Sequence, residues 1–200
     1  MDIKEFFEHS EGKWFSQRTR YNLASAQSEN SKSEITIEML SQDDPEVVKL
    51  CQQSDVNAAS TWGGAKISWD NSVDDRQEKQ TGYAVVVPIP NADKPEEGKL
   101  LQTRSDDGKS PTIGRYIVGN DESLTLIAED ETTYLEERLW FAHPNLRLRT
   151  VLNGSDQFSM AAFYSVLRSG KVSGFSSVLS RLSRRSENPH AFRLGSVKLP

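Results

Sequence analysis

The chain has 200 residues and a formal net charge of −5, with 36% hydrophobic and 26% charged residues. This length suits one domain with a sizeable core, and this composition excludes a disordered chain. A single cysteine, Cys51, excludes an internal disulfide and favours a reducing compartment, while no apolar run approaches the roughly 18 residues of a membrane span.

The chain begins with a predicted short helix and two strands. Residues 2–9 predict the helix. The N-terminus lacks the basic-then-apolar layout of a secretion signal. Alternation from Trp14 to Leu23 predicts a strand. Residues 24–33 are expected to form a polar turn, and residues 35–39 alternate again and predict a second strand.

A second helix is predicted from Pro45 to Ser54, because Ser and Asp residues before a proline form a typical helix start. Strands dominate the rest of the body, and polar turn signals separate them. About ten short strands with one or two short helices predict a mainly β fold, in which an antiparallel sheet closes into a barrel and so loses its edges. The later predicted strands cover residues 65–71, 82–90, 99–104, 114–118, 123–128, 132–142, 145–152 and 158–168.

Residues 1–168 are therefore predicted to form a single β-barrel domain, followed by a basic extension over residues 169–200. The extension holds six basic residues and one acid, so it carries about +5 and the remainder about −10. The acidic body argues against nucleic acid as a partner. The extension predicts either a short basic amphipathic helix or a partly ordered segment. Its helically spaced apolar residues are Phe175, Val178, Leu179 and Leu182.

A Gly-x-Trp tripeptide, Gly12-Lys13-Trp14, opens the first predicted strand. It is typical of lipocalin-like barrels, where the Trp fills the closed end and an Arg from a late strand lies over its ring. Arg147 or Arg149 is expected to supply that Arg. Since the tripeptide is common by chance, the all-β pattern after it is what supports a barrel.

Residues 134–151, YLEERLWFAHPNLRLRTV, predict a β-hairpin rich in charged and aromatic side chains. Successive residues of a strand point to opposite faces. One face of its first strand therefore carries Glu136, Arg138 and Trp140, and the other carries Glu137 with Leu and Phe residues. The second strand adds two arginines.

The charges of this hairpin allow two interpretations. In the first, Glu136, Arg138, Arg147 and Arg149 take part in cross-strand salt bridges in water, each worth well under ~1 kcal/mol. In the second, Arg147 and Arg149, joined by Arg18 of the first strand, line the inner wall of a binding site. Arg suits such a wall because its guanidinium grips carboxylates with two hydrogen bonds.

The remaining candidates are few. Trp69 is either a core residue or a flat wall for a conjugated ligand. The three histidines lack metal-ligand spacing, so no metal site is predicted, and Cys51 lies on the apolar side of its helix and is expected to be packed rather than nucleophilic. Phosphate-binding loops and serine-hydrolase motifs are absent, which excludes the common hydrolases, kinases and dehydrogenases.

Several long motifs closely resemble the S-type phycobiliprotein lyases, the CpcS/CpeS family, over roughly residues 1–168. The resemblance implies a lipocalin-like (fatty-acid-binding-protein-like) barrel of about ten strands. It also implies that the protein binds an open-chain tetrapyrrole, such as phycocyanobilin, and attaches it by a thioether bond to a cysteine of a phycobiliprotein subunit. The motifs are FFEHSEGKWFSQRTRY, DDPEVVKLCQQ, GGAKISWD, GRYIVGNDESLTLI, EERLWFAHPNLRLRT and FSMAAFYSVLR.

The resemblance gives the candidates roles. Arginines are expected to hold the two bilin propionates, and tryptophans to supply stacking surface. Glu136 or Glu137 is expected to bind pyrrole N–H groups or to help protonate the bilin, which makes it a better electrophile for a thiolate. Only one of these neighbours can point inward, and Glu136 is the expected one. The expected ligand-binding residues are Arg18, Trp69, Trp140, Arg147 and Arg149.

No cofactor is required in this scheme, since the bilin is the substrate and the nucleophile belongs to the acceptor protein. The expected partners are a bilin and an apo-phycobiliprotein subunit, in the cyanobacterial cytoplasm or the plastid stroma. A homodimer or a related lyase subunit stays open, and neither nucleic acid nor a membrane span is expected. The alternatives are a non-catalytic carrier of a bilin, haem or fatty acid, and a structural protein with a filled barrel.

Overall fold

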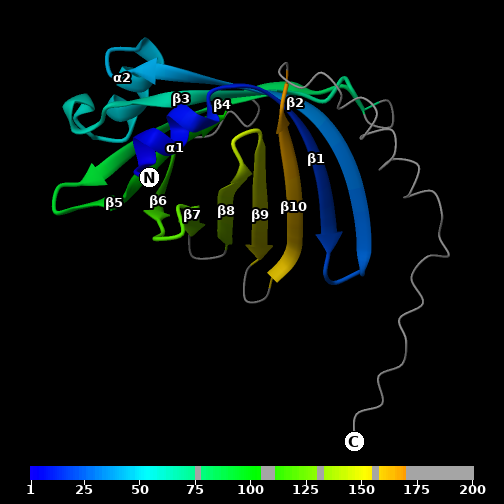
Figure 1. The fold of residues 1–200 in the computed structure, drawn as a ribbon. Helices are drawn as coiled ribbons and strands as arrows, with labels where there is room; N and C mark the ends of the chain where they lie inside the picture. The colour runs from blue at the N-terminus through cyan, green and yellow to red at the C-terminus, as the bar shows by residue number, and fades with distance from the viewer. Residues whose placement is uncertain (75–77, 105–110, 130–132, 155–157, 170–200) are drawn as a thin grey trace, which may run out of the picture. The chain divides into compact units, whose positions relative to one another are not determined.

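The computed structural model describes residues 1–74, 78–104, 111–129, 133–154 and 158–169 (Figure 1). It contains α1 (Ile3–Ser10), α2 (Pro45–Gln53) and a short 3-10 helix η1 (Ala58–Ser60). The strands are β1 (Gly12–Asn22), β2 (Gln27–Ser41), β3 (Gly63–Asp70), β4 (Thr81–Asn91), β5 (Lys94–Arg104), β6 (Thr112–Val118), β7 (Leu124–Glu129), β8 (Tyr134–His143), β9 (Leu146–Gly154) and β10 (Phe158–Arg168).

These strands form one closed antiparallel barrel. Each pairs with its neighbours in chain order, and β10 pairs back onto β1. Because the ring is closed, none of the ten strands presents a free edge. The predicted barrel of about ten strands with short helices is confirmed. The predicted C-terminal extension lies, from Gly170 on, outside the described residues.

The first hairpin is longer than the sequence predicts. Residues 24–33 were expected to form a turn, but β2 already begins at Gln27 and pairs with Asn22 of β1. The true turn is short, and Ala26 within it has a φ of 52°. The expectation is wrong because residues 27–33 join the sheet through backbone hydrogen bonds, which polar residues make without any apolar alternation.

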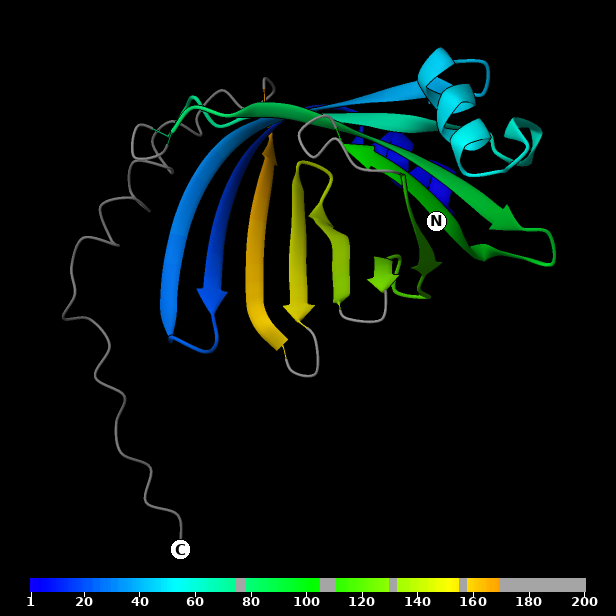
Figure 2. The same ribbon diagram turned by 180° about the vertical axis from the view of Figure 1, so that it is seen from behind.

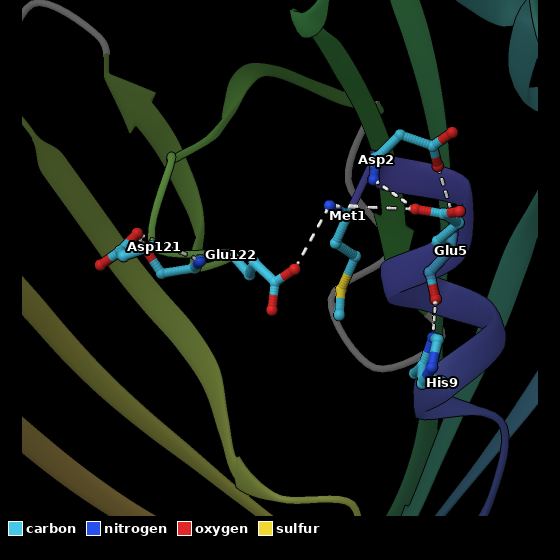
Figure 3. Close-up of polar contacts among 7 residues, drawn as sticks. Met1, Asp2, Glu5, His9, Asp121 and Glu122 are labelled. Atoms are coloured by element: carbon cyan, nitrogen blue, oxygen red, sulfur yellow. Dashed lines mark hydrogen bonds and ion pairs between the residues drawn. The ribbon is translucent and has the colours of Figure 1, made fainter.

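Helix α1 closes one end of the barrel. Its N-terminus is a capping box: Asp2 accepts from the Glu5 N–H at 2.8 Å, and Glu5 accepts from the Asp2 N–H at 2.9 Å (Figure 3). Ile3, Phe6 and Phe7 are each at most 6% exposed and belong to the core. Their burial against the barrel residues fills this end, so we call it the closed end.

The start of α1 also contacts the turn between β6 and β7. The Met1 amino group lies 3.6 Å from a Glu122 carboxylate oxygen and 4.0 Å from one of Glu5 (Figure 3). Both glutamates are more than half exposed, so these ion pairs contribute little. The buried apolar residues of the helix therefore do most to hold α1 in place.

Helix α2 lies on the outside of the barrel, beside β4 and β5 (Figure 2). Asp44 caps it by accepting from the Glu46 N–H at 2.8 Å, and Pro45 begins it, as predicted. Its apolar side packs on outward residues of the two strands, in a cluster separate from the interior. Cys51 is fully buried there, and burial raises the pKa of its thiol. This cysteine is therefore packed and not poised as a nucleophile.

Candidate functional site

The interior of the barrel is identified by Trp14 at the closed end. Trp14 is 1% exposed and packs near Phe141, with ring centroids 6.3 Å apart. Since strand residues alternate between faces, Arg18 on β1 shares the inner face with Trp14. The barrel register then places Arg18 beside Tyr164 of β10, and Tyr164 beside Arg149 of β9. The three side chains form one row across the inner wall.

Glu137 joins this row from β8. One of its carboxylate oxygens accepts a hydrogen bond from the Arg149 guanidinium at 2.7 Å. Arg149 also lies over the ring of Tyr164, 4.6 Å from the centroid. Burial lowers the pKa of Arg149, but the charge of Glu137, the interaction with Tyr164 and the hydrogen bond to Glu137 together outweigh it, and the net shift of the pKa is upward. Glu137 and Arg149 thus form a charged pair inside the wall, and Arg149 stays protonated.

Arg147 lies one step nearer the closed end and has no such carboxylate partner among the described residues. It is 7% exposed, donates to the Ser10 hydroxyl at 3.0 Å, and has its guanidinium 5.5 Å from the Trp14 ring centre. Burial, followed by the charges of Arg149 and Arg168, lowers the pKa of Arg147 to about 9. This cation is held at a free-energy cost in the ligand-free protein.

Three arginines of the interior keep hydrogen-bonding capacity. The Nε atoms of Arg18, Arg147 and Arg149 are buried and donate no hydrogen bond within the described part of the chain. Buried donors without an acceptor are rare in folded proteins, because each costs free energy. An anionic group with several oxygens would satisfy them. The inner wall is therefore chemically suited to carboxylates.

Arg168, at the end of β10, lies at the closed end of the barrel. Its guanidinium donates to the carbonyls of His9 and Glu11 at 2.6 and 2.5 Å and lies 4.2 Å from the Trp14 ring centre. Arg147 or Arg149 was expected over Trp14. Arg147 does lie near that ring, but Arg168 is nearer, and Arg149 contacts Tyr164 instead.

Trp69 reaches the inner face from β3, where its register partner on β2 is Ile35 of the core. On β4 its partner is Gly82, and a Cβ at that position would lie 2.5 Å from the Trp69 ring. The glycine therefore leaves room for the indole to lie flat against the wall. This placement suits the predicted role as a flat surface in the binding site.

A small cavity of about 30 Å³ opens beside Glu137. Leu135 and Leu126 give it an apolar side, and Gln102 and Thr112 add polar groups. A space of this size holds about one water molecule. A larger ligand that reached Glu137 would have to displace side chains of the wall.

Two predicted site residues lie on the opposite side of the wall. Glu136 accepts from the Tyr134 hydroxyl at 2.6 Å, and Trp140 alternates with the inward Leu139 and Phe141, so both face outward. The expectation that Glu136 points inward is wrong. The reason is Phe141, whose packing against Phe6 at 5.2 Å between ring centroids turns the Leu/Phe face, and Glu137 with it, toward the interior.

The interpretation in which Glu136, Arg138, Arg147 and Arg149 form cross-strand salt bridges in water is also wrong. Arg138 pairs instead with Asp121 at 2.5 Å on the outside. A register shift between Phe141 and His143 pairs Phe141 with Arg147, so the two arginines of β9 share the apolar inner face. The structure thus places Arg18, Trp69, Glu137, Arg147 and Arg149 on the inner face, and Glu136 and Trp140 on the outer one.

Sequence reasoning missed three residues of the site: Ser10, Tyr164 and Arg168. Alternation in FSMAAFYSVLR would have placed Tyr164 and Arg168 on one face, but nothing local shows that this face is the inner one. Ser10 has no sequence signal, because its contact with Arg147 spans most of the barrel domain.

Within the described ranges, no three His, Cys, Asp or Glu side chains are grouped so that they could hold a metal ion. No helix in these ranges has the length and apolar character needed to cross a membrane.

Comparison with known proteins places the chain in a family. Residues 2–169 match the family model described as CpeS-like protein. The chain is 52% identical over 171 residues to a protein of Thermosynechococcus vestitus named chromophore lyase CpcS/CpeS, covering 85% of this chain and 94% of that one. It is 39% identical over 151 residues to the phycocyanobilin lyase subunit CpcS of Picosynechococcus sp., covering 74% and 76%.

A solved structure agrees with the fold. The S-type phycobiliprotein lyase CPES from Guillardia theta superposes with a TM-score of 0.73 at 28% identity, covering 86% of this chain and 95% of that one. The barrel, the order of its motifs and the matched residues lead to one conclusion: the chain belongs to the CpeS-like family.

Proposed function

We propose that this protein is a chromophore lyase. It binds an open-chain tetrapyrrole inside the barrel and attaches it by a thioether bond to a cysteine of a phycobiliprotein subunit. The names of the relatives support the reaction class, since they are chromophore and phycocyanobilin lyases. The location implied by this function is the compartment in which phycobiliproteins are assembled, the cyanobacterial cytoplasm or the plastid stroma.

One observation carries the proposal: Arg147 is a buried cation with an unused Nε donor. A bilin has two propionates, and a propionate at Arg147 would both satisfy that donor and compensate its charge. Arg149 and Arg18 lie in the adjacent row and suit the second propionate. Arginines provide this grip because their planar guanidinium matches a carboxylate.

The other inward residues contact the pyrrole rings of the bilin. The Glu137 carboxylate accepts hydrogen bonds from pyrrole N–H groups, while Arg149 holds it in place. Trp69 offers a flat surface to one part of the conjugated chain. Together these contacts select one conformation of a flexible molecule and present its reactive end to the acceptor.

The bond-forming step joins two partners held by this protein. The acceptor cysteine, as a thiolate, adds its sulfur to the ethylidene carbon of ring A and forms the C–S bond. The displaced π electrons of the exocyclic double bond take up a proton, so the adduct is an isomer of the two reactants. Protonating the bilin makes that carbon more electrophilic, and the carboxylate of Glu137 beside the pyrrole N–H groups favours the protonated form. No described cysteine of this chain is needed.

The test is transfer in a purified system. The protein, phycocyanobilin and an apo-phycobiliprotein subunit are mixed, and zinc-induced fluorescence of the acceptor after denaturing electrophoresis reports the covalent adduct. Arg147→Ala should lower both bilin affinity and adduct yield, while Arg138→Ala, the outward arginine of β8, should leave both unchanged. Bilin binding with no more adduct than the spontaneous reaction would instead make the protein a carrier.

A further inference from the structure

The last turn of α1 is bonded to three strands of the barrel. Ser10, the final residue of the helix, is 1% exposed. Its carbonyl accepts from the Trp14 indole N–H of β1 at 2.8 Å, and its hydroxyl accepts from Arg147 of β9 at 3.0 Å. Arg168 of β10 donates to the carbonyls on either side of Ser10. The helix therefore meets the barrel through polar contacts as well as through its apolar residues.

The Ser10 hydroxyl has a fixed direction of hydrogen bonding. It donates its single proton to the Phe6 carbonyl, one turn earlier in the helix, at 2.9 Å. A hydroxyl has one donor and two acceptor sites, so toward Arg147 this oxygen can only accept. The bond to Phe6 also holds the serine in one rotamer. Arg147 thus faces an acceptor whose position is set by the helix before any ligand is present.

The end of α1 also favours cations. The last carbonyls of a helix carry a partial negative charge. Two guanidinium groups lie at this end, 5.5 Å (Arg147) and 4.2 Å (Arg168) from the Trp14 ring centre, and their like charges repel. Arg168 bonds the backbone carbonyls, whereas Arg147 bonds the Ser10 side chain. The His9 ring bonds back to the Glu5 carbonyl of its own helix at 2.7 Å (Figure 3).

The contact with Ser10 uses one end of the Arg147 guanidinium. The bond is made by Nη1, while Nε is buried and has no acceptor within the described part of the chain. A free arginine samples many rotamers, and a ligand that orders it loses that entropy on binding. An arginine held at Nη1 in advance avoids this loss. The bond to Ser10 therefore prepares Arg147 to receive an anion at Nε.

We propose that Ser10 is a positioning residue of the bilin site, whose hydroxyl holds the Arg147 guanidinium so that Nε is left to bind a propionate. This inference rests on the proposed function, because it assigns the anion to the bilin. Ser10 itself does not touch the ligand. Helix α1 then has two roles, since it fills the closed end and orients an arginine of the wall.

Bilin affinity of the full chain tests this role. Absorbance titration with phycocyanobilin, without an acceptor subunit, should show about tenfold weaker binding by Ser10→Ala, because Arg147 is no longer held in place. Adduct formation at saturating bilin should change much less, since the propionate contact serves the bound bilin and the transition state alike. Ser10→Thr keeps the hydroxyl and should restore most of the affinity.

The mobility of Arg147 in the ligand-free protein is the second readout. Nitrogen-15 NMR detects the Arg147 Nε–H group, which is assigned by its absence from Arg147→Met. Its heteronuclear NOE should be as high as that of the rigid backbone in the parent and in Ser10→Thr, and clearly lower in Ser10→Ala. A serine that only stabilised the helix would not change this value.

Thr61→Val is the matched control. Thr61 is 7% exposed, and its hydroxyl lies 2.7 Å from the carbonyl oxygens of Gly63 and Pro88. The variant removes a buried hydroxyl that does not bond Arg147, so the affinity and the NOE should stay at the parent values. A parent that binds no bilin would refute the proposed function and this role with it. Bilin binding that Ser10→Ala leaves unchanged, or that Thr61→Val weakens equally, would refute the role of Ser10 alone.

Discussion

Glu136 and Glu137 are neighbours in sequence and lie on opposite sides of the barrel wall. Glu137 is bonded to Arg149 in the interior, whereas Glu136 is bonded to the Tyr134 hydroxyl outside. The same substitution at the two positions therefore separates an effect on the lumen from an effect on the surface.

Glu137→Gln should reduce bilin affinity and adduct yield by about tenfold or more, because the amide binds pyrrole N–H groups less strongly than a carboxylate. It should also lower the free energy of unfolding by about 1–2 kcal/mol, since Arg149 loses its partner in a largely buried place. Fluorescence titration and urea denaturation measure the two effects. Glu136→Gln is the control, and equal losses in both variants would contradict an inward role for Glu137.

Replacing Arg147 should stabilise the ligand-free protein. The folded protein lowers the pKa of Arg147 to about 9, so the folded state binds this proton less tightly than the unfolded chain does, and the residue costs stability at neutral pH. Arg147→Met should therefore raise the free energy of unfolding by about 1–3 kcal/mol at pH 7. The gain should shrink as the pH rises above 9. Urea denaturation across this range measures it, and a less stable variant would refute the prediction.

Bilin affinity should fall as the pH rises through about 9. Below that value Arg147 is charged and can hold a propionate; above it, the free protein loses this charge. Affinity measured by absorbance titration from pH 7 to pH 10 should decline in the parent protein. In Arg147→Met the same titration should be nearly flat, apart from any titration of the bilin itself. A parallel decline in both proteins would assign the effect to the bilin.

Gly82→Ala should disturb Trp69. The new Cβ would lie 2.5 Å from the indole, so the ring must move. The expected loss is about 1–3 kcal/mol in the free energy of unfolding, together with weaker bilin binding. Thermal denaturation measures the first and titration the second. In a Trp69→Leu background the same change should cost little, and an undiminished cost there would show that the glycine acts on another group.

Local pattern predicted much of this structure, but not which side of the wall is inside. The alternation of β1 correctly placed Arg18 on the face of Trp14, since that requires only the period of a strand. The orientation of β8 depends on Phe141 meeting Phe6, a contact between distant parts of the chain. The pairing of Phe141 with Arg147 depends on an irregularity in the hairpin register. A stretch of a few residues of sequence indicates neither the Phe141–Phe6 contact nor the pairing of Phe141 with Arg147.

The predicted turn at residues 24–33 failed for a related reason. Polar residues from Gln27 onward extend β2 because β1 is present to pair with them. Strand formation there is a property of the pair, and the sequence of one partner does not show it.

Arg168 binds the carbonyls of His9 and Glu11 and covers Trp14, and β10 supplies the last seam of the barrel. During synthesis, helix α1 and Trp14 of β1 therefore leave the ribosome more than a hundred residues before Arg168 and β10, which later cover them. Contacts so distant in sequence form slowly, because a long loop must close first. The closed end should be the last part of the barrel to become native, and until then its aromatic residues are the surface that a chaperone would meet.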